Sequence, residues 1–170
     1  MYEFREANST EFESLGALMV KVYSQLEGFP SEEEQPDYYQ RLREVGVFTS
    51  YPKAKLFVAV SEKGVVDGGV VYFGDMRFYG AGGEATINQN AAAFRLLAVN
   101  PEIRGKGLGK GLIDSCLEQA KKDGHRSMVI HSTKTMMVAW KMYERMGFRR
   151  FTEIDFVQED LEVYGFRLKL

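Results

Sequence analysis

The sequence contains very little cysteine and histidine. Of its 170 residues, one is cysteine, Cys116, and two are histidine, His125 and His131. A single cysteine excludes disulfide bonds within the chain and favours a reducing, cytoplasmic setting. Because no close cluster of Cys, His and Asp is present, we expect no metal site. Cys116 falls on an apolar helical stripe, which indicates a core residue rather than a nucleophile.

Long apolar runs are also missing. No stretch approaches the roughly 20 residues that a membrane-spanning helix needs. The N-terminal MYEFREANSTEFE lacks the basic and apolar regions of a secretory signal, so we expect no membrane partner. A chain of 170 residues, 45% of them hydrophobic, can bury a core without a covalent staple. We therefore expect one domain over residues 1–170.

The net charge of −2 conceals a strong asymmetry between two parts of the chain. Residues 95–150 contain 12 Lys and Arg against 5 Asp and Glu, and the remainder contains 10 against 19. The basic part lacks the interleaved aromatics and Arg/Lys runs of nucleic-acid binders, so no nucleic-acid partner is expected. A compact phosphorylated ligand fits this charge better.

The periodicity of the apolar residues predicts strands and helices in mixed order. Helices are expected at residues 9–25, 37–45, after the glycine-rich segment to about 122, and at 136–146. Strands are expected at 2–5, 56–60, 68–76, 94–99, 127–131, 148–156 and 162–170, with a long polar loop or an irregular hairpin over 78–90. Hairpins mixed with crossovers indicate an α+β or mixed α/β fold rather than a doubly wound parallel sheet.

A glycine occurs at every second position of the segment RGKGLGKG, residues 104–111. A strand, a glycine-rich turn and a helix start together form an anion site, because backbone N–H groups and the helix dipole point at the ligand. The dinucleotide spacing G-x-G-x-x-G fails because Lys110 stands where the third glycine is needed. The P-loop spacing fails at Arg104 and Gly111. A nucleotide-phosphate enzyme is therefore the weaker reading.

The spacing R-x-x-G-x-G is present as Arg104 to Gly109, and a second block, A-x-x-x-Y-x-x-x-G-F, spans residues 139–148. Together these blocks resemble the GCN5-related N-acetyltransferase (GNAT) superfamily. The resemblance implies a single domain with a mostly antiparallel sheet of about seven strands and about four helices. It also implies a parallel pair of strands, about 94–99 and 127–131, that splay apart.

The resemblance further implies acetyl-CoA as co-substrate and no metal. The backbone of the first splayed strand would pair with the pantetheine arm, here through Leu97, Ala98 and Val99. The backbone amides of the loop would hold the pyrophosphate, here through Arg104, Gly105, Lys106, Gly107, Leu108, Gly109 and Lys110. Tyr143 occupies the position of the general acid that protonates the departing thiolate, although a role as a core residue on the same helical stripe stays open.

Two departures from the family pattern concern chemistry. Met136 stands seven residues before Tyr143, where many members have an asparagine that contacts the cofactor. Residues 91–95 offer no carboxylate to act as a base. His131 is the first candidate for that base, ahead of Glu84 and Asp75, and a satisfied structural histidine or a water chain would serve as well.

We therefore expect direct acetyl transfer from acetyl-CoA to a primary amine of an unidentified acceptor, a small molecule or a peptide. The alternative is a non-catalytic acyl-CoA-binding sensor with the same fold. A homodimer is possible, because dimers are common in the family. The acidic stretch 32–34 would favour a cationic acceptor if it faced the site.

Overall fold

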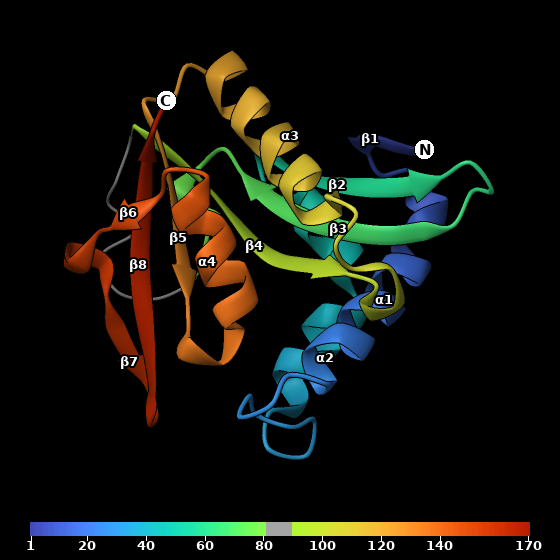
Figure 1. The fold of residues 1–170 in the computed structure, drawn as a ribbon, viewed down its shortest axis with the longest axis horizontal. Helices are drawn as coiled ribbons and strands as arrows, with labels where there is room; N and C mark the ends of the chain where they lie inside the picture. Colours follow the sequence, from blue (N-terminus) through green and yellow to red (C-terminus); the bar gives the residue numbers. More distant parts are fainter. Residues whose placement is uncertain (81–89) are drawn as a thin grey trace.

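The computed structural model describes residues 1–80 and 90–170, and Figure 1 shows their arrangement. The four α-helices are α1 (Phe12–Ser24), α2 (Pro36–Arg43), α3 (Leu108–Lys122) and α4 (Met137–Arg145). The strands are β1 (Tyr2–Glu6), β2 (Ala54–Ser61), β3 (Val66–Phe73), β4 (Ala91–Val99), β5 (Ser127–Ser132), β6 (Arg149–Arg150), β7 (Phe156–Gln158) and β8 (Leu161–Lys169). The predicted α+β fold class is confirmed, with eight described strands where about seven were expected.

The strands form a sheet in the order β1-β2-β3-β4-β5-β8-β6, and β7 pairs with β8. All pairings are antiparallel except that of β4 with β5, which is parallel. This parallel pairing covers only residues 91–93 of β4 and 127–129 of β5. Beyond residue 93 the two strands diverge, as Figure 1 shows. The predicted parallel pair is therefore present and splayed, with its paired end just before residue 94.

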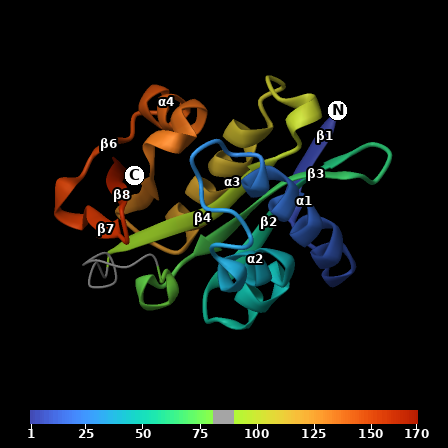
Figure 2. The ribbon, with the colours of Figure 1, turned by 90° about the horizontal axis from the view of Figure 1, so that it is seen from below.

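The helices cover opposite faces of the sheet and enclose two apolar clusters. One cluster gathers buried side chains of α1 and α2, such as Leu15 and Leu42, against one face of β2, β3 and β4. The other gathers side chains of α3 and α4, such as Leu112 and Tyr143, against the opposite face. Figure 2 shows α2 and α4 on opposite sides of β4. The divergence of β4 and β5 therefore lies between two helical layers.

The start of α1 differs from the expected helix over 9–25. Residues Ser9–Glu11 form a 3-10 turn, and Asn8 precedes it. The Glu11 carboxylate accepts the Asn8 backbone N–H at 2.8 Å, an arrangement that fixes the entry of the chain into the helix.

The expected strand over 148–156 is wrong, because the chain there forms β6, a 3-10 turn at Thr152–Ile154, and then β7. The physical reason for this interruption is Gly165 of β8, against which the 3-10 turn packs. Ile154 packs so closely over Gly165 that a Cβ there would overlap it. The Asp155 carboxylate accepts the Gly165 N–H at 2.6 Å, replacing a backbone partner in the ladder. The strand is thereby interrupted after Arg150.

Candidate active site

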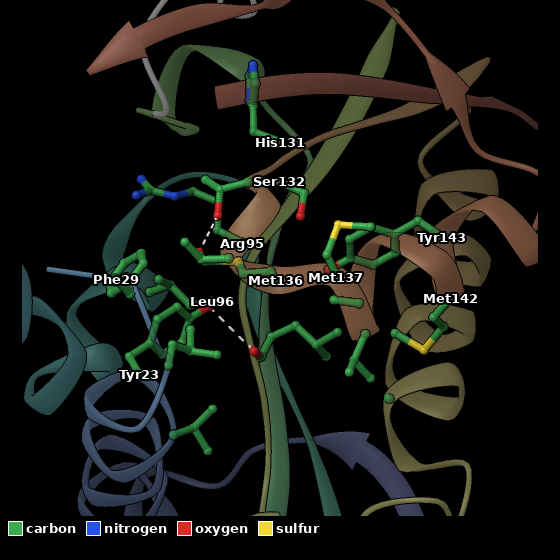
Figure 3. A pocket seen from close by; sticks show the side chains of 18 of the residues that line it. Tyr23, Phe29, Arg95, Leu96, His131, Ser132, Met136, Met137, Met142 and Tyr143 are labelled. Atoms are coloured by element: carbon green, nitrogen blue, oxygen red, sulfur yellow. Dashed lines mark hydrogen bonds between the residues drawn. The ribbon is translucent and has the colours of Figure 1, made fainter. Parts of the chain in front are cut away.

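A pocket of about 1040 Å³ opens where β4 and β5 part. Its walls come from both layers: Tyr23, Phe29 and Tyr38 from the α1 and α2 side, and Met142 and Tyr143 from α4. Figure 3 shows Phe29 and Tyr23 on one side of the pocket and Tyr143 and Met142 on the other. The pocket therefore crosses the sheet through the gap between the strands.

A bulge in β4 shapes the middle of this pocket. The register with β3 shifts because three residue steps of β4, from Arg95 to Ala98, match two steps of β3. Leu96 has a φ of +56°, a left-handed conformation that is rare for a branched side chain and costs on the order of 1–3 kcal/mol. The bulge turns both Arg95 and Leu96 toward the pocket. Local sequence carries no sign of this distortion.

The glycine-rich segment begins at Arg104, directly after the 3-10 turn Pro101–Ile103, and runs into α3. Gly105 and Gly107 have φ values of +83° and +79°, and a Cβ on either would meet no atom within 4 Å. Their need for glycine is therefore conformational, and the space above them is open to a ligand. Gly107 caps α3, so the free N–H groups of its first turn face that space. Gly111 differs, because a Cβ there would overlap Phe4 of β1.

Most of the predicted cofactor residues line the pocket. These are Leu97, Val99, Arg104, Gly105, Gly107, Leu108, Gly109 and Lys110. Ala98 is instead buried in the core and Lys106 is exposed outside the pocket lining, so each would contribute only its backbone or long-range charge. Lys110 also pairs with Asp114 at 2.7 Å on the helix surface. Arg145 of α4 adds a third cationic side chain to Arg104 and Lys110.

Tyr143 lies on the inner face of α4 and is only 6% exposed. Its ring packs against Phe94 and Phe148, with centroids 5.8 and 5.9 Å away. Burial, followed by the proximity of Tyr79 and Cys116, raises the pKa of Tyr143 well above its ordinary value. The hydroxyl therefore remains protonated at neutral pH and can donate a proton into the pocket that it lines. The ring serves as core and the hydroxyl faces the site.

His131 lines the same pocket with both ring nitrogens engaged by protein atoms. Nε2 lies 2.7 Å from the Ile154 carbonyl oxygen, which can only accept, so Nε2 carries the proton. Nδ1 therefore accepts from the Tyr79 hydroxyl at 2.9 Å. Burial lowers the pKa of His131, and the neighbouring Arg95 charge acts in the same direction. A base role for His131 thus requires the Tyr79 hydroxyl to pass the proton.

The other candidates for the base are placed differently. Asp75 forms an ion pair with Arg77 at 2.7 Å and is not part of the pocket lining. Glu84 lies outside the described residues. In the acidic stretch, Glu32 pairs with Arg43 and Glu34 accepts the Ser31 N–H at 2.7 Å. None of residues 32–34 lines the pocket, so nothing in its lining supports their predicted attraction of a cationic acceptor.

Sequence reasoning missed three polar groups that face the pocket. Ser132 is 3% exposed, and its Oγ has no hydrogen-bond partner within residues 1–80 and 90–170. Tyr38 is half-buried, and burial raises its pKa to about 12. Arg95 interrupts the apolar run AAAFRLLAV. That charged residue inside a buried strand was the available signal, because such a side chain needs a polar partner.

Met136 and Cys116 are apolar parts of the structure. Met136 precedes α4, lines the pocket and packs against the α1 and α2 cluster. Cys116 is fully buried, as predicted, and burial raises the pKa of its thiol, so it is no nucleophile. Among the described residues, no three His, Cys, Asp or Glu side chains gather closely enough to hold a metal ion. Nor does any described helix reach the length and apolarity of a membrane span.

Several solved structures are similar in fold to this chain over nearly its whole length. An acetyltransferase of the GNAT family from Staphylococcus aureus Mu50 superposes with a TM-score of 0.75 at 15% identity, covering 100% of this chain and 99% of that one. The PaiA N-acetyltransferase from Thermoplasma acidophilum, solved in complex with coenzyme A, gives 0.74 at 16% identity, covering 97% and 98%. At these identities the likeness establishes the fold alone.

Sequence comparison adds the family. The N-acetylaspartate synthetase of Danio rerio is 34% identical over 68 residues, which are 40% of this chain and 24% of that protein. The chain thus matches about a quarter of the length of this curated relative. The sequence model described as the acetyltransferase (GNAT) family matches residues 19–148, which include the glycine-rich loop, the diverging strands and Tyr143. The chain therefore belongs to the GNAT family of acetyltransferases.

Proposed function

We propose that the protein transfers the acetyl group of acetyl-CoA directly to a primary amine. One observation carries this proposal: a single pocket joins the unpaired half of β4, the glycine-rich loop and the Tyr143 hydroxyl. A CoA thioester has a pyrophosphate that matches the glycine-rich loop, an amide-rich arm that matches the unpaired half of β4, and a sulfur that matches the Tyr143 hydroxyl.

Binding of acetyl-CoA would use backbone groups for the most part. The first-turn amides of α3 and the left-handed glycines of the loop would hold the pyrophosphate, with Arg104 and Lys110 beside it. The pantetheine amides would pair with Leu97 to Val99, on the strand edge that β5 leaves free. Because Met136, just before α4, replaces an asparagine, no side-chain amide is available there to bind CoA. The glycine-rich loop and β4 would therefore make most of the contacts that recognise CoA.

The chemistry requires two protons to leave the acceptor ammonium and one to reach the sulfur. A neutral amine attacks the thioester carbonyl, the carbon–sulfur bond breaks, and the CoA thiolate takes the Tyr143 proton as it leaves. Backbone N–H groups at the β4 bulge, where Leu96 has its left-handed conformation, would stabilise charge on the carbonyl oxygen. The acceptor ammonium loses one proton before the attack, to water or, through the Tyr79 hydroxyl, to His131 Nδ1. Its nitrogen releases a second proton to solvent as the amide forms. Tyr143 regains its proton from solvent.

The relatives support an N-acetyl product without fixing the acceptor. The Danio rerio relative and a second one, from Xenopus tropicalis, are both named N-acetylaspartate synthetase, a name that describes an amine acetylated on nitrogen. Because the match spans only 24% of one and 22% of the other, we take the reaction type from them and not the acceptor. A single buried cysteine supports action in the reducing cytoplasm.

The test is thiol release from acetyl-CoA in the presence of a panel of primary amines, with the product identified by mass. We expect equal amounts of free CoA and of an amine heavier by one acetyl group. The Tyr143→Phe variant is expected to bind acetyl-CoA but release thiol slowly. Binding of acetyl-CoA without turnover of any amine would instead favour the acyl-CoA sensor.

A further inference from the structure

Arg95 lies at the point where β4 leaves β5. The last paired residue of β4 is Ala93, and the bulge begins directly after Arg95. The side chain is half-buried and lines the pocket. One guanidinium nitrogen, Nη1, donates to the Tyr79 carbonyl oxygen at 2.9 Å, which holds the side chain on the α1 and α2 side of the sheet. Figure 3 shows it extending to the side of Phe29, away from Tyr143.

The guanidinium of Arg95 forms no ion pair with an acidic side chain among the described residues. Within residues 1–80 and 90–170, no carboxylate lies within 4 Å of its nitrogens. The guanidinium has five N–H donors, and a single hydrogen bond is formed by it in this part of the chain. Among the described residues, its charge acts to lower the pKa of Tyr23, Tyr38, Tyr79 and His131, which are aromatic or imidazole groups. A half-buried cation with unused donors is stabilised by an anionic ligand.

The pyrophosphate of CoA is not that anion. Arg95 and Val99 are four residue steps apart on the strand, at most roughly 13 Å of extended chain, and the glycine-rich loop lies farther on. Arg95 also points to the face opposite α3 and α4. The loop has its own cations in Arg104 and Lys110. Arg95 therefore belongs to the acceptor end of the pocket.

The surroundings define the chemistry of the anion. Phe29, Tyr23 and Tyr38 form an aromatic wall, with ring centroids 5.5 to 6.1 Å apart, beside the guanidinium. A planar guanidinium with free parallel donors matches a carboxylate held by two hydrogen bonds. The aromatic wall would contact the carbon skeleton of the same small molecule.

We propose that the acceptor is a small primary amine that also carries a carboxylate, as an amino acid does, and that Arg95 binds this carboxylate. The inference rests on the proposed function and names the substrate class of the same site. Arg95 anchors the acceptor from the α1 and α2 side, so that its amine reaches the thioester where β4 and β5 part. Arg95 is therefore a specificity residue, and it takes no part in proton transfer.

The experiment compares amino acids with amines that lack the carboxylate. Thiol release is measured for the twenty common amino acids, and each one turned over is compared with its amide and with its decarboxylated amine. For the wild-type protein we expect kcat/KM to be on the order of 100-fold higher for the acid than for either analogue, because a charged hydrogen-bonded pair is lost. Equal rates for acid and amide would overturn the proposal.

Variants locate the effect. Arg95→Gln is expected to raise KM for the acid on the order of 100-fold, to leave the amide within about threefold, and to leave acetyl-CoA affinity unchanged. Arg95→Lys, which keeps the charge without the fork, should recover part of the loss. Arg149→Gln is the matched control, because Arg149 is an exposed arginine of β6 outside the pocket. If Arg95→Gln slowed acid and amide equally, Arg95 would be a structural residue only.

The outcome for the carboxylate site is separable from that for the enzyme. Without turnover, the thermal shift of the protein saturated with CoA still compares each amino acid with its amide. If amino acids but not their amides raised the melting temperature, and Arg95→Gln abolished this rise, the carboxylate site would be supported even if no amine were acetylated. If amines were acetylated with no preference for a carboxylate, the proposed acetyltransferase activity would be supported and the proposed carboxylate site would be refuted.

Discussion

At the residue scale, the dual position of Tyr143 allows a sharp test. Its ring is packed in the core while its hydroxyl faces the pocket, so Tyr143→Phe removes the proton donor with little loss of packing. We predict a fall in kcat of about 100-fold or more, the usual contribution of a positioned acid, with acetyl-CoA affinity changed less than about threefold. Steady-state thiol release and calorimetric binding measure the two quantities.

The control for this substitution is Tyr164→Phe. Tyr164 also packs against an aromatic side chain, Trp140, but its hydroxyl donates to Glu162 and it is not part of the pocket lining. This variant should keep the wild-type kcat. An unchanged kcat in Tyr143→Phe would remove Tyr143 as the acid.

His131 links stability to pH. Its pKa is lowered from the ordinary 6.5, mainly by burial, so the unfolded chain binds a proton over a pH range in which the folded chain does not. Stability is therefore fully present above about pH 6.5 and is lost as the pH falls toward the lowered pKa of the folded state. We predict that His131→Gln flattens this part of the curve of unfolding free energy against pH, measured with urea. An equal slope in wild type and His131→Gln would show that other groups govern the acid side of the curve.

At the element scale, the loop before α3 can be tested with a matched pair of glycines. Gly107 and Gly64 have φ values of +79° and +78°, and a Cβ on either would meet no atom within 4 Å. Alanine at either position thus has the same backbone cost, about 1–2 kcal/mol of stability. Gly107 lies in the pocket and Gly64 in the turn between β2 and β3.

We predict that Gly107→Ala weakens CoA binding at least tenfold, because the new methyl and the strained turn displace the amides that would hold the pyrophosphate. Gly64→Ala should lose similar stability and bind CoA as the wild type does. Calorimetric titration with CoA and denaturant unfolding of both variants check this. Equal CoA affinity in the two variants would exclude the loop as the pyrophosphate site.

At the scale of the whole molecule, the features that could be predicted from the sequence are those set by residues close together in the chain. The helices, most strands and the glycine-rich loop carry local signals of periodicity and turn chemistry, and resemblance to a family supplied the splayed strands. The strand interruption at Thr152–Ile154 was missed because it depends on Gly165, which is distant in the sequence. The pocket around Arg95 was missed because its walls come from α1, α2 and β5. Contacts between distant segments decide these features, and no local pattern records them.

The proposed reaction depends on acetyl-CoA lying in the gap between the diverging strands β4 and β5. Backbone hydrogen exchange, measured with and without CoA, tests it most directly. We predict slower exchange of amides in residues 97–99 and 104–110 when CoA is bound, while those in the paired segment 91–93 change little. Protection by CoA elsewhere, with none in residues 97–99 and 104–110, would contradict it.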